Sequence, residues 1–175
     1  MVKYEVRTCK PGDERALSIV AQATILETYA PLVRGENLYE YVTEELNAAR
    51  FRSLLEDPSM RLWAAEFETT RSIVGYAHAL PDADDRSAME LKRIYLLNRF
   101  RGAGIGKRLL DETIAFALER SFRAILLRVH HKNEVAIGFY RRNGFRPVGE
   151  ESFPAGDEVS TVLVMRLGLD RHGTA

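Results

Sequence analysis

The sequence predicts an α/β (α+β) domain in which a mixed, mostly antiparallel sheet of about seven strands is covered by four helices. Three observations lead to this fold class. A strand-like segment and two helical segments come first, three strand-like runs joined by short polar segments follow, and the second half alternates helix with strand. The predicted order is therefore β-α-α-β-β-β-α-β-α-β-β.

The first half of the chain begins with a strand and two helices. Val2 to Arg7 alternates apolar and polar side chains as a half-buried strand does, and Pro11 to Asp13 then introduces a helix. The apolar face of this helix contains Leu17, Val20, Ala21, Thr24 and Ile25. Asn37 followed three residues later by Glu40 resembles a capping box, so we expect one second helix from Asn37 to about Leu55.

Strands dominate the middle of the chain, and helices return after it. We expect an antiparallel meander of three strands, Met60 to Phe67, Ile73 to Leu80 and Ala88 to Leu97. A helix then begins near Ile105, with an apolar stripe of Ile105, Leu109, Leu110, Ile114, Ala117 and Leu118. The remaining elements are a strand from Ala124 to His130 buried on both faces, a helix capped by Asn133 that ends before a left-handed Gly144, and strands from Phe145 to Glu150 and Thr161 to Leu167.

Length and composition limit the class of protein. The chain has 175 residues with 46% hydrophobic and 29% charged side chains and no net charge, which suits one globular domain without a bulk preference for nucleic acid. We expect one domain over residues 1–169 and a tail from Asp170 to Ala175. A single cysteine, Cys9, excludes an intramolecular disulfide, and no apolar stretch is long enough for a leader or a membrane span, so a cytoplasmic protein is expected.

A glycine-rich loop between a strand and a helix carries the strongest functional signal. The segment from Arg101 to Lys107 contains Gly102, Gly104 and Gly106 and leads into the helix near Ile105. Free N–H groups at a helix start attract a phosphate, and glycines let it approach the backbone. Six basic residues and no acid lie between Leu91 and Leu110: Lys92, Arg93, Arg99, Arg101, Lys107 and Arg108. We therefore expect an anion to bind at this loop.

The spacing of the loop narrows the kind of anion. Arg101 stands where a Walker A loop needs its first glycine, and Lys107 stands where a dinucleotide fingerprint needs its last. The pattern Arg-x-x-Gly-x-Gly, filled by Arg101, Gly104 and Gly106, instead resembles the pyrophosphate loop of the GCN5-related N-acetyltransferases (GNAT). Taken alone, such a turn is also found at ordinary helix starts.

Two longer blocks strengthen the resemblance to this superfamily. The segment MELKRIYLLNRFRGAGIGKRLL resembles the strand, loop and helix that hold acetyl-CoA, and RAILLRVHHKNEVAIGFYRRNGF resembles the strand and helix that follow. With the order of elements they cover about residues 60 to 167. The resemblance implies an N-acetyltransferase that moves the acetyl group of acetyl-CoA directly onto a primary amine in a ternary complex, with no metal.

A narrower resemblance points to the PaiA-type spermidine/spermine N-acetyltransferases. It rests on ILETYAPL, on KRIYLLNRF with Asn98 where most of the superfamily has proline, and on SFPAGDEVSTVLVMRL. Five carboxylates between Glu27 and Glu45 against the single base Arg34 would suit a cationic polyamine acceptor, although a solvated helix face is the commoner meaning of such charge. A protein N-terminus, a lysine, an aminoglycoside, or acetyl-CoA sensing without turnover are the alternatives.

The resemblance also assigns roles to individual residues. For the cofactor it implies the backbone of Ile94, Tyr95 and Leu96, the loop residues Arg101, Gly102, Ala103, Gly104, Ile105, Gly106 and Lys107, and the side chains of Asn133, Tyr140 and either Arg141 or Arg142. Glu90 matches a general base and Tyr140 the general acid that protonates the departing thiolate. The alternatives are a surface carboxylate for Glu90, a packed aromatic for Tyr140 and a plain helix cap for Asn133.

Other reactive side chains point to no further chemistry. His130 and His131 are adjacent, so we expect them to face opposite sides of a strand and not to chelate a metal. Cys9 has no histidine near it in sequence, so a covalent acyl-enzyme is not expected. The expected partner is a small amine; nucleic acid and membrane are not expected, and the resemblance makes a homodimer possible.

Overall fold

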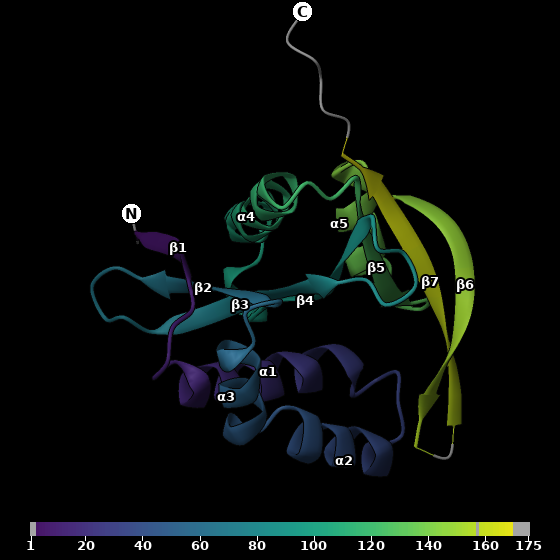
Figure 1. The fold of residues 1–175 in the computed structure, drawn as a ribbon. Coiled ribbons are helices and arrows are strands. Elements are labelled where there is room, and N and C mark those ends of the chain that lie inside the picture. The colour runs from purple at the N-terminus through teal and green to yellow at the C-terminus, as the bar shows by residue number, and fades with distance from the viewer. Residues whose placement is uncertain (1–2, 157, 170–175) are drawn as a thin grey trace, which may run out of the picture.

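The structure is a computed structural model that describes residues 3–156 and 158–169. Seven strands and five α-helices are found among these residues, with a short 3₁₀ helix before the fourth α-helix (Figure 1). In chain order they are β1 (Tyr4–Thr8), α1 (Glu14–Tyr29), α2 (Gly35–Glu45), α3 (Ala48–Glu56), β2 (Arg61–Phe67), β3 (Ile73–Pro81), β4 (Ala88–Leu96), η1 (Asn98–Phe100), α4 (Ile105–Glu119), β5 (Ala124–His130), α5 (Glu134–Arg142), β6 (Arg146–Ala155) and β7 (Glu158–Gly168). The expected first strand, Val2 to Arg7, corresponds to β1, and its first residue Val2 and the expected tail at 170–175 fall outside the described residues.

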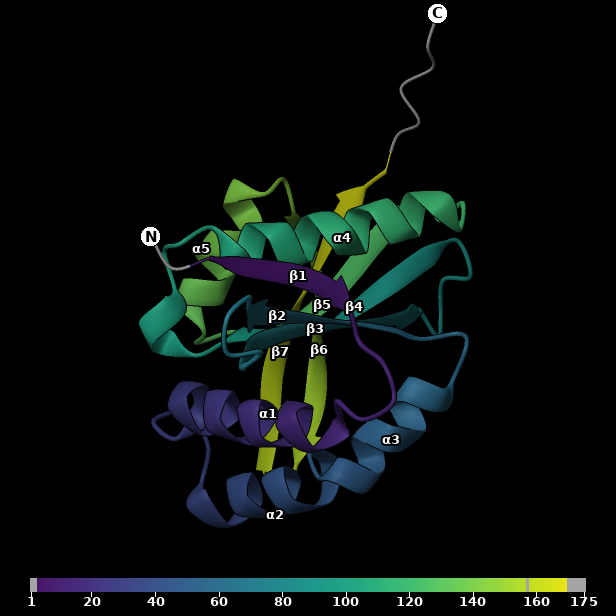
Figure 2. The same ribbon diagram turned by 90° about the vertical axis from the view of Figure 1, so that its left-hand side faces the viewer.

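One mixed sheet organises the molecule, as the sequence predicts. Its strand order is β1-β2-β3-β4-β5-β7-β6, and every neighbouring pair is antiparallel except β4 and β5. Figures 1 and 2 show α1, α2 and α3 on one face of the sheet and α4 and α5 on the other. The middle strands β2, β3 and β5 are therefore buried on both faces along most of their length.

The expected single helix from Asn37 to Leu55 is wrong, because two helices occupy this region. The Asn47 side chain accepts the Arg50 N–H at 2.9 Å at the start of α3 and donates to the Thr43 and Glu44 carbonyl oxygens, at 3.1 and 2.8 Å, at the end of α2. One amide side chain thus caps both helix ends. The expected capping box is also wrong, since α2 begins at Gly35 and Asn37 lies inside it.

The last two strands are longer than their sequence pattern predicts. They pair with one another from Arg146 and Arg166 to Ala155 and Glu158, and this hairpin extends past the sheet to α2. A Cβ on Gly156, at the tip of the hairpin, would overlap the Asn37 side chain. The hairpin therefore packs closely on α2 and encloses the space between α2 and the sheet.

A bulge in β4 changes the direction of its side chains. Arg93 is paired with His78, and Leu91 with Ala79, so Lys92 is an extra residue that has no partner on β3. Met89 and Leu91 pack in the α4 core before the bulge, and Ile94 and Leu96 do so after it. Lys92 and Arg93 consequently both lie on the α1–α3 side of the sheet.

β4 and β5 separate just before the bulge. Their parallel pairing is restricted to Ala88–Glu90 with Ala124–Leu126. From residue 91 onward, the side of β4 that faces β5 has no strand partner. We refer to this unpaired stretch, between β4 and β5, as the open seam.

No helix among the described residues is long and apolar enough to cross a membrane.

Candidate active site

The glycine loop lies at one end of the open seam and exposes a helix start. Gly102 and Gly104 have left-handed φ values of +82° and +78°, which only glycine adopts at low cost. The first hydrogen bond of α4 runs from the Arg108 N–H to the Gly104 carbonyl at 3.1 Å, so the N–H groups of residues 105–107 precede the helical ladder. The predicted loop therefore has the backbone geometry for binding an anion.

The basic side chains at this loop contribute less to anion binding than the sequence suggests, because two of the three make contacts within the protein. Arg101 is exposed, whereas Lys107 forms an ion pair with Asp111 one turn along α4. Arg108 lies over the ring of Tyr4, 5.5 Å from its centroid. Backbone donors and Arg101 are thus the groups available to an anion.

Tyr4, on β1, holds the loop and was missed by sequence reasoning. Its hydroxyl donates to the carbonyl of Ala103, 99 residues away in the chain. A further restraint comes from α1, where the Glu27 carboxylate accepts the Asn98 N–H at 3.0 Å. Since no local pattern joins positions so far apart, only the fold reveals these contacts.

The open seam fits the thioester cofactor that the resemblance implies. Ile94, Tyr95 and Leu96 lie on the unpaired stretch of β4, where backbone groups can bind the amides of an extended arm. Gly106 at the start of α4 faces Phe139 of α5, because a Cβ there would lie 3.6 Å from the ring. The glycine loop, the free strand edge and α5 therefore meet at one place.

Tyr140 and Asn133 come from α5 at the other side of the seam. The Tyr140 ring packs between those of Phe139 and Phe145 and is 7% exposed. Burial, and secondarily the nearby Tyr29, raises the pKa of Tyr140, so its hydroxyl keeps its proton at neutral pH. Asn133 caps α5, accepting the Ala136 N–H at 3.2 Å. Arg142 is exposed on the last turn of the same helix.

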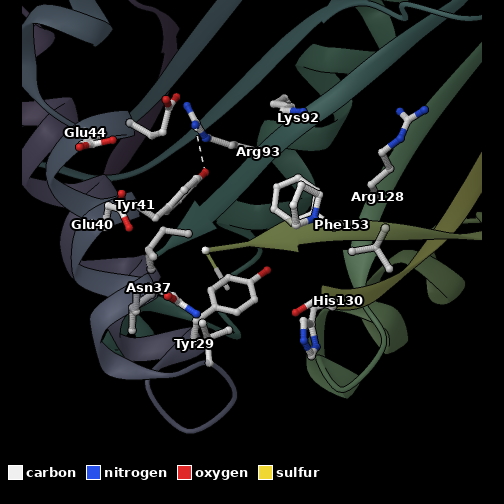
Figure 3. A pocket seen from close by; sticks show the side chains of 18 of the residues that line it. Tyr29, Asn37, Glu40, Tyr41, Glu44, Lys92, Arg93, Arg128, His130 and Phe153 are labelled. Carbon is white, nitrogen blue, oxygen red and sulfur yellow. Dashed lines mark hydrogen bonds between the residues drawn. The ribbon is translucent and has the colours of Figure 1, made fainter. Parts of the chain in front are cut away.

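A cavity of about 640 Å³ lies on the α1–α3 side of the seam (Figure 3). Its walls come from α1, α2, α3, β4, β5 and the β6–β7 hairpin. The α2 wall carries Glu40, Glu44 and Glu45, whereas the β4 wall carries Glu90, Lys92 and Arg93. The cavity is therefore lined by charges of both signs.

The predicted base Glu90 lies in this cavity wall and is 7% exposed. Its carboxylate is 3.4 Å from the Lys92 ammonium and 3.3 Å from the Arg128 guanidinium. Arg128 also pairs with Asp82 at 3.0 Å and Glu151 at 2.7 Å, and these partners raise its pKa against the opposing effect of burial. Glu90 is thus a nearly buried carboxylate, held by two cations at the cavity.

Sequence reasoning missed the side chains of three tyrosines and a histidine near the seam, and it assigned one of these residues, Tyr95, through its backbone alone. The hydroxyls of Tyr29 and Tyr95 lie 3.3 Å apart, and Tyr41 binds Arg93. Burial raises the pKa values of Tyr29 and Tyr95. His130 also lines the cavity, where its ring forms an edge-to-face contact with the ring of Tyr29.

The expectation that the two adjacent histidines face opposite sides is wrong. Their rings stack with centroids 4.9 Å apart, because β5 ends at His130 and His131 lies in the following turn. Within residues 3–156 and 158–169, no group of three or more His, Cys, Asp or Glu side chains is placed to hold a metal ion. Cys9 is part-buried beside α1, and burial raises the pKa of its thiol.

Comparisons with known proteins identify the same family that the sequence resembles. The model of the acetyltransferase (GNAT) family matches residues 25–145. An uncharacterized N-acetyltransferase of Mycobacterium tuberculosis is 33% identical over 153 residues, which are 87% of this chain and 96% of the relative.

Solved structures share the fold over nearly the whole chain. The PaiA N-acetyltransferase of Thermoplasma acidophilum, in complex with coenzyme A, has a TM-score of 0.79 at 22% identity and covers 95% of this chain and 99% of its own. A chimeric spermidine N-acetyltransferase from Vibrio cholerae and a human enzyme has a TM-score of 0.69 at 18% identity, covering 94% and 95%. At these identities the likeness shows the fold alone.

Proposed function

The chain belongs to the GNAT acetyltransferase family, whose members use acetyl-CoA, and from this premise we propose that it acetylates a primary amine bound in the cavity beside Glu90 and Tyr140. The transfer is direct, within a ternary complex of enzyme, acetyl-CoA and amine. The observation that carries the proposal is that the glycine loop, the unpaired edge of β4, Tyr140 and the charged cavity all border one open seam.

The loop and the seam are the proposed cofactor site. Backbone N–H groups from Gly102 to Lys107, with Arg101, bind the phosphates, and the backbone of residues 94–96 orients the extended arm. Asn133 and Arg142 complete the site from α5. When bound, acetyl-CoA supplies an acyl group activated as a thioester. The protein's part is to place the amine beside that group and to exclude water.

Two side chains are proposed to move protons. An alkyl amine with a pKa near 10.4 is mostly protonated at pH 7, so the attacking amine must lose a proton. Glu90 accepts this proton, directly or through water, and Lys92 and Arg128 keep its carboxylate in the cavity wall. The Tyr140 hydroxyl, protonated at neutral pH, donates its proton to the leaving sulfur.

The acceptor that we propose is a small cationic amine, and polyamines are candidates supported by the acidic α2 wall. Glu40 and Glu44 line the cavity and form no ion pair within the described part of the chain, so they can attract an ammonium group. Of the other acids near them in sequence, Glu27 binds the β4–α4 loop and Glu36 pairs with Arg34 at 3.7 Å. Protein termini, lysine side chains and aminoglycosides are the competing acceptors.

The proposal is tested by following thiol release from acetyl-CoA with a panel of polyamines, amino acids, aminoglycosides and peptides. We expect at least one acceptor to be acetylated and Tyr140→Phe to slow it. Phe116→Tyr, which changes a ring by one hydroxyl in the α4 core away from the seam, is the matched control. If coenzyme A raises the melting temperature but no acceptor turns over, the chain senses acetyl-CoA instead. If neither occurs, the proposal is wrong.

A further inference from the structure

Arg93 is a buried cation without an acidic partner. It is 8% exposed and lines the cavity, and among the described residues its side chain forms one hydrogen bond, which Nη2 donates to the Tyr41 hydroxyl at 3.1 Å (Figure 3). No carboxylate lies within ion-pair distance of it in the described part of the chain. Taking a cation out of water costs several kcal/mol unless an anion and hydrogen bonds compensate it.

Two part-buried arginines of this chain, Arg7 and Arg128, are paired with acids, and Arg128 lines the same cavity as Arg93. Arg7 binds Asp13 and Glu66, each at 2.7 Å, and Arg128 binds Asp82 and Glu151 at 3.0 and 2.7 Å. Arg61, also part-buried, instead lies over the Phe116 ring, 4.7 Å from its centroid. Arg93 is the one fully buried arginine among the described residues, and it has neither an acid nor an aromatic face as its partner.

The side chains that neighbour Arg93 on β3 also carry no negative charge that could compensate its positive charge. Its cross-strand partner His78 is 3% exposed, and both of its ring nitrogens are buried without a hydrogen bond. Burial, and then the charge of Arg93, lowers the pKa of His78 to about 3, so its ring is neutral. The Tyr76 hydroxyl is likewise buried without a partner. The two buried polar side chains on β3 next to Arg93, His78 and Tyr76, are thus both uncharged.

The other cations of the cavity are already neutralised. Lys92 pairs with Glu90 at 3.4 Å, and Arg50 pairs with Glu45 at 3.6 Å. Among the described residues that line the cavity, Arg93 is consequently a positive charge without an ion-pair partner, while Glu40 and Glu44 on α2 are negative charges without one. A ligand that neutralises the charges on both walls of the cavity must therefore carry a negative group and a positive group.

The phosphates of the cofactor do not meet this need. The bulge at Lys92 turns Arg93 toward α2, where it binds Tyr41, whereas the glycine loop leads into α4 on the opposite face of the sheet. The anion that reaches Arg93 must therefore come through the cavity.

We infer that Arg93 binds a carboxylate of the acceptor, so that the acceptor is a small amino acid-like molecule with its ammonium held by α2. This inference rests on the proposed function and narrows it. A polyamine would be attracted by α2 but would leave Arg93 unpaired, and its own positive charges would be repelled there. An arginine suits this role because its planar fork binds both oxygens of a carboxylate.

Two matched pairs of ligands test the inference, because each pair differs by one carboxylate: ornithine with putrescine, and lysine with cadaverine. Equilibrium binding to the protein–coenzyme A complex is measured by calorimetry for the wild type, Arg93→Gln and Arg93→Lys. Arg50→Gln removes a cavity cation that is already paired and serves as the matched control. Thermal melting of each variant shows that it is folded.

We expect the wild type and Arg50→Gln to bind the amino acids about ten- to a hundred-fold more tightly than the diamines. Arg93→Gln should weaken the binding of the amino acids alone and so reduce this ratio of affinities to near one. Arg93→Lys should retain part of the ratio. Equal or tighter binding of the diamines by the wild type, or an unchanged ratio in Arg93→Gln, would overturn the inference. If the wild type binds the diamines at least as tightly and acetylates one of them, carboxylate binding by Arg93 is refuted but the proposed function is kept. If the wild type binds the amino acids preferentially but acetylates none of them, carboxylate binding is supported and the proposed function is refuted.

Discussion

The buried His78 makes the stability of this protein sensitive to acid in a calculable way. Its folded-state pKa of about 3 lies well below the ordinary value of 6.5, so the unfolded chain binds a proton that the folded chain refuses. The stabilising effect of keeping this ring neutral is complete above about pH 6.5 and is lost as the pH falls toward about 3. These two pKa values give a loss of about 2 kcal/mol between pH 8 and pH 5.

Replacing His78 with leucine should remove that loss. Urea unfolding of the wild type and His78→Leu is measured at several pH values between about 8 and 5. We expect the variant's advantage in the free energy of unfolding to grow by about 2 kcal/mol over this range. Parallel curves for the wild type and His78→Leu would refute the neutral, buried histidine and, with it, the isolation of Arg93.

Three further predictions concern the seam and the helices. Tyr140→Phe should lower kcat by about a hundred-fold or more with coenzyme A affinity unchanged, measured by steady-state kinetics and calorimetry. Gly104→Ala forces a left-handed backbone on an alanine at a cost of about 1–2 kcal/mol, and should weaken coenzyme A binding measured by calorimetry. Asn47→Ala should lower the free energy of unfolding by about 1 kcal/mol or more in urea, because one side chain caps α2 and α3.

Each of these predictions has a distinct contrary result. A Tyr140→Phe enzyme with wild-type kcat would exclude the hydroxyl as the proton donor. Gly104→Ala binding coenzyme A as the wild type does would show that the loop does not hold the phosphates. Asn47→Ala with unchanged stability would mean that solvent caps the two helix ends equally well; Asn143→Ala, at the end of α5, offers a comparison with a side chain that binds one carbonyl, that of Phe139.

The sequence predicts the parts of the fold that local chemistry decides. The start of α4 at Ile105 follows from the glycines, and β5 has the predicted bounds because an apolar run of that length suits a doubly buried strand. The division between α2 and α3 was missed because Asn47 acts as a cap only once both helix ends meet at it. The length of the β6–β7 hairpin likewise depends on pairing between strands and on the contact with α2.

The proposed cofactor side of the candidate site carries patterns that are visible in the sequence, whereas the cavity side carries few. The glycine loop and Tyr140 carry local patterns, whereas Tyr4 and Ala103 meet from 99 residues apart. One signal for Arg93 was present, since the apolar residues Leu91 and Ile94 are separated by three positions where a regular strand needs two. That interval marks the bulge, and the bulge is what turns Arg93 into the cavity.

The most direct test of the account is mass spectrometry of a candidate acceptor incubated with the protein and acetyl-CoA, with thiol release followed in parallel. The account predicts that a small primary amine gains one acetyl group in proportion to the thiol released, and that both signals fall together in Tyr140→Phe. An acceptor panel that gains no acetyl group, with thiol release equal to that without protein, would contradict acetyl transfer by this chain.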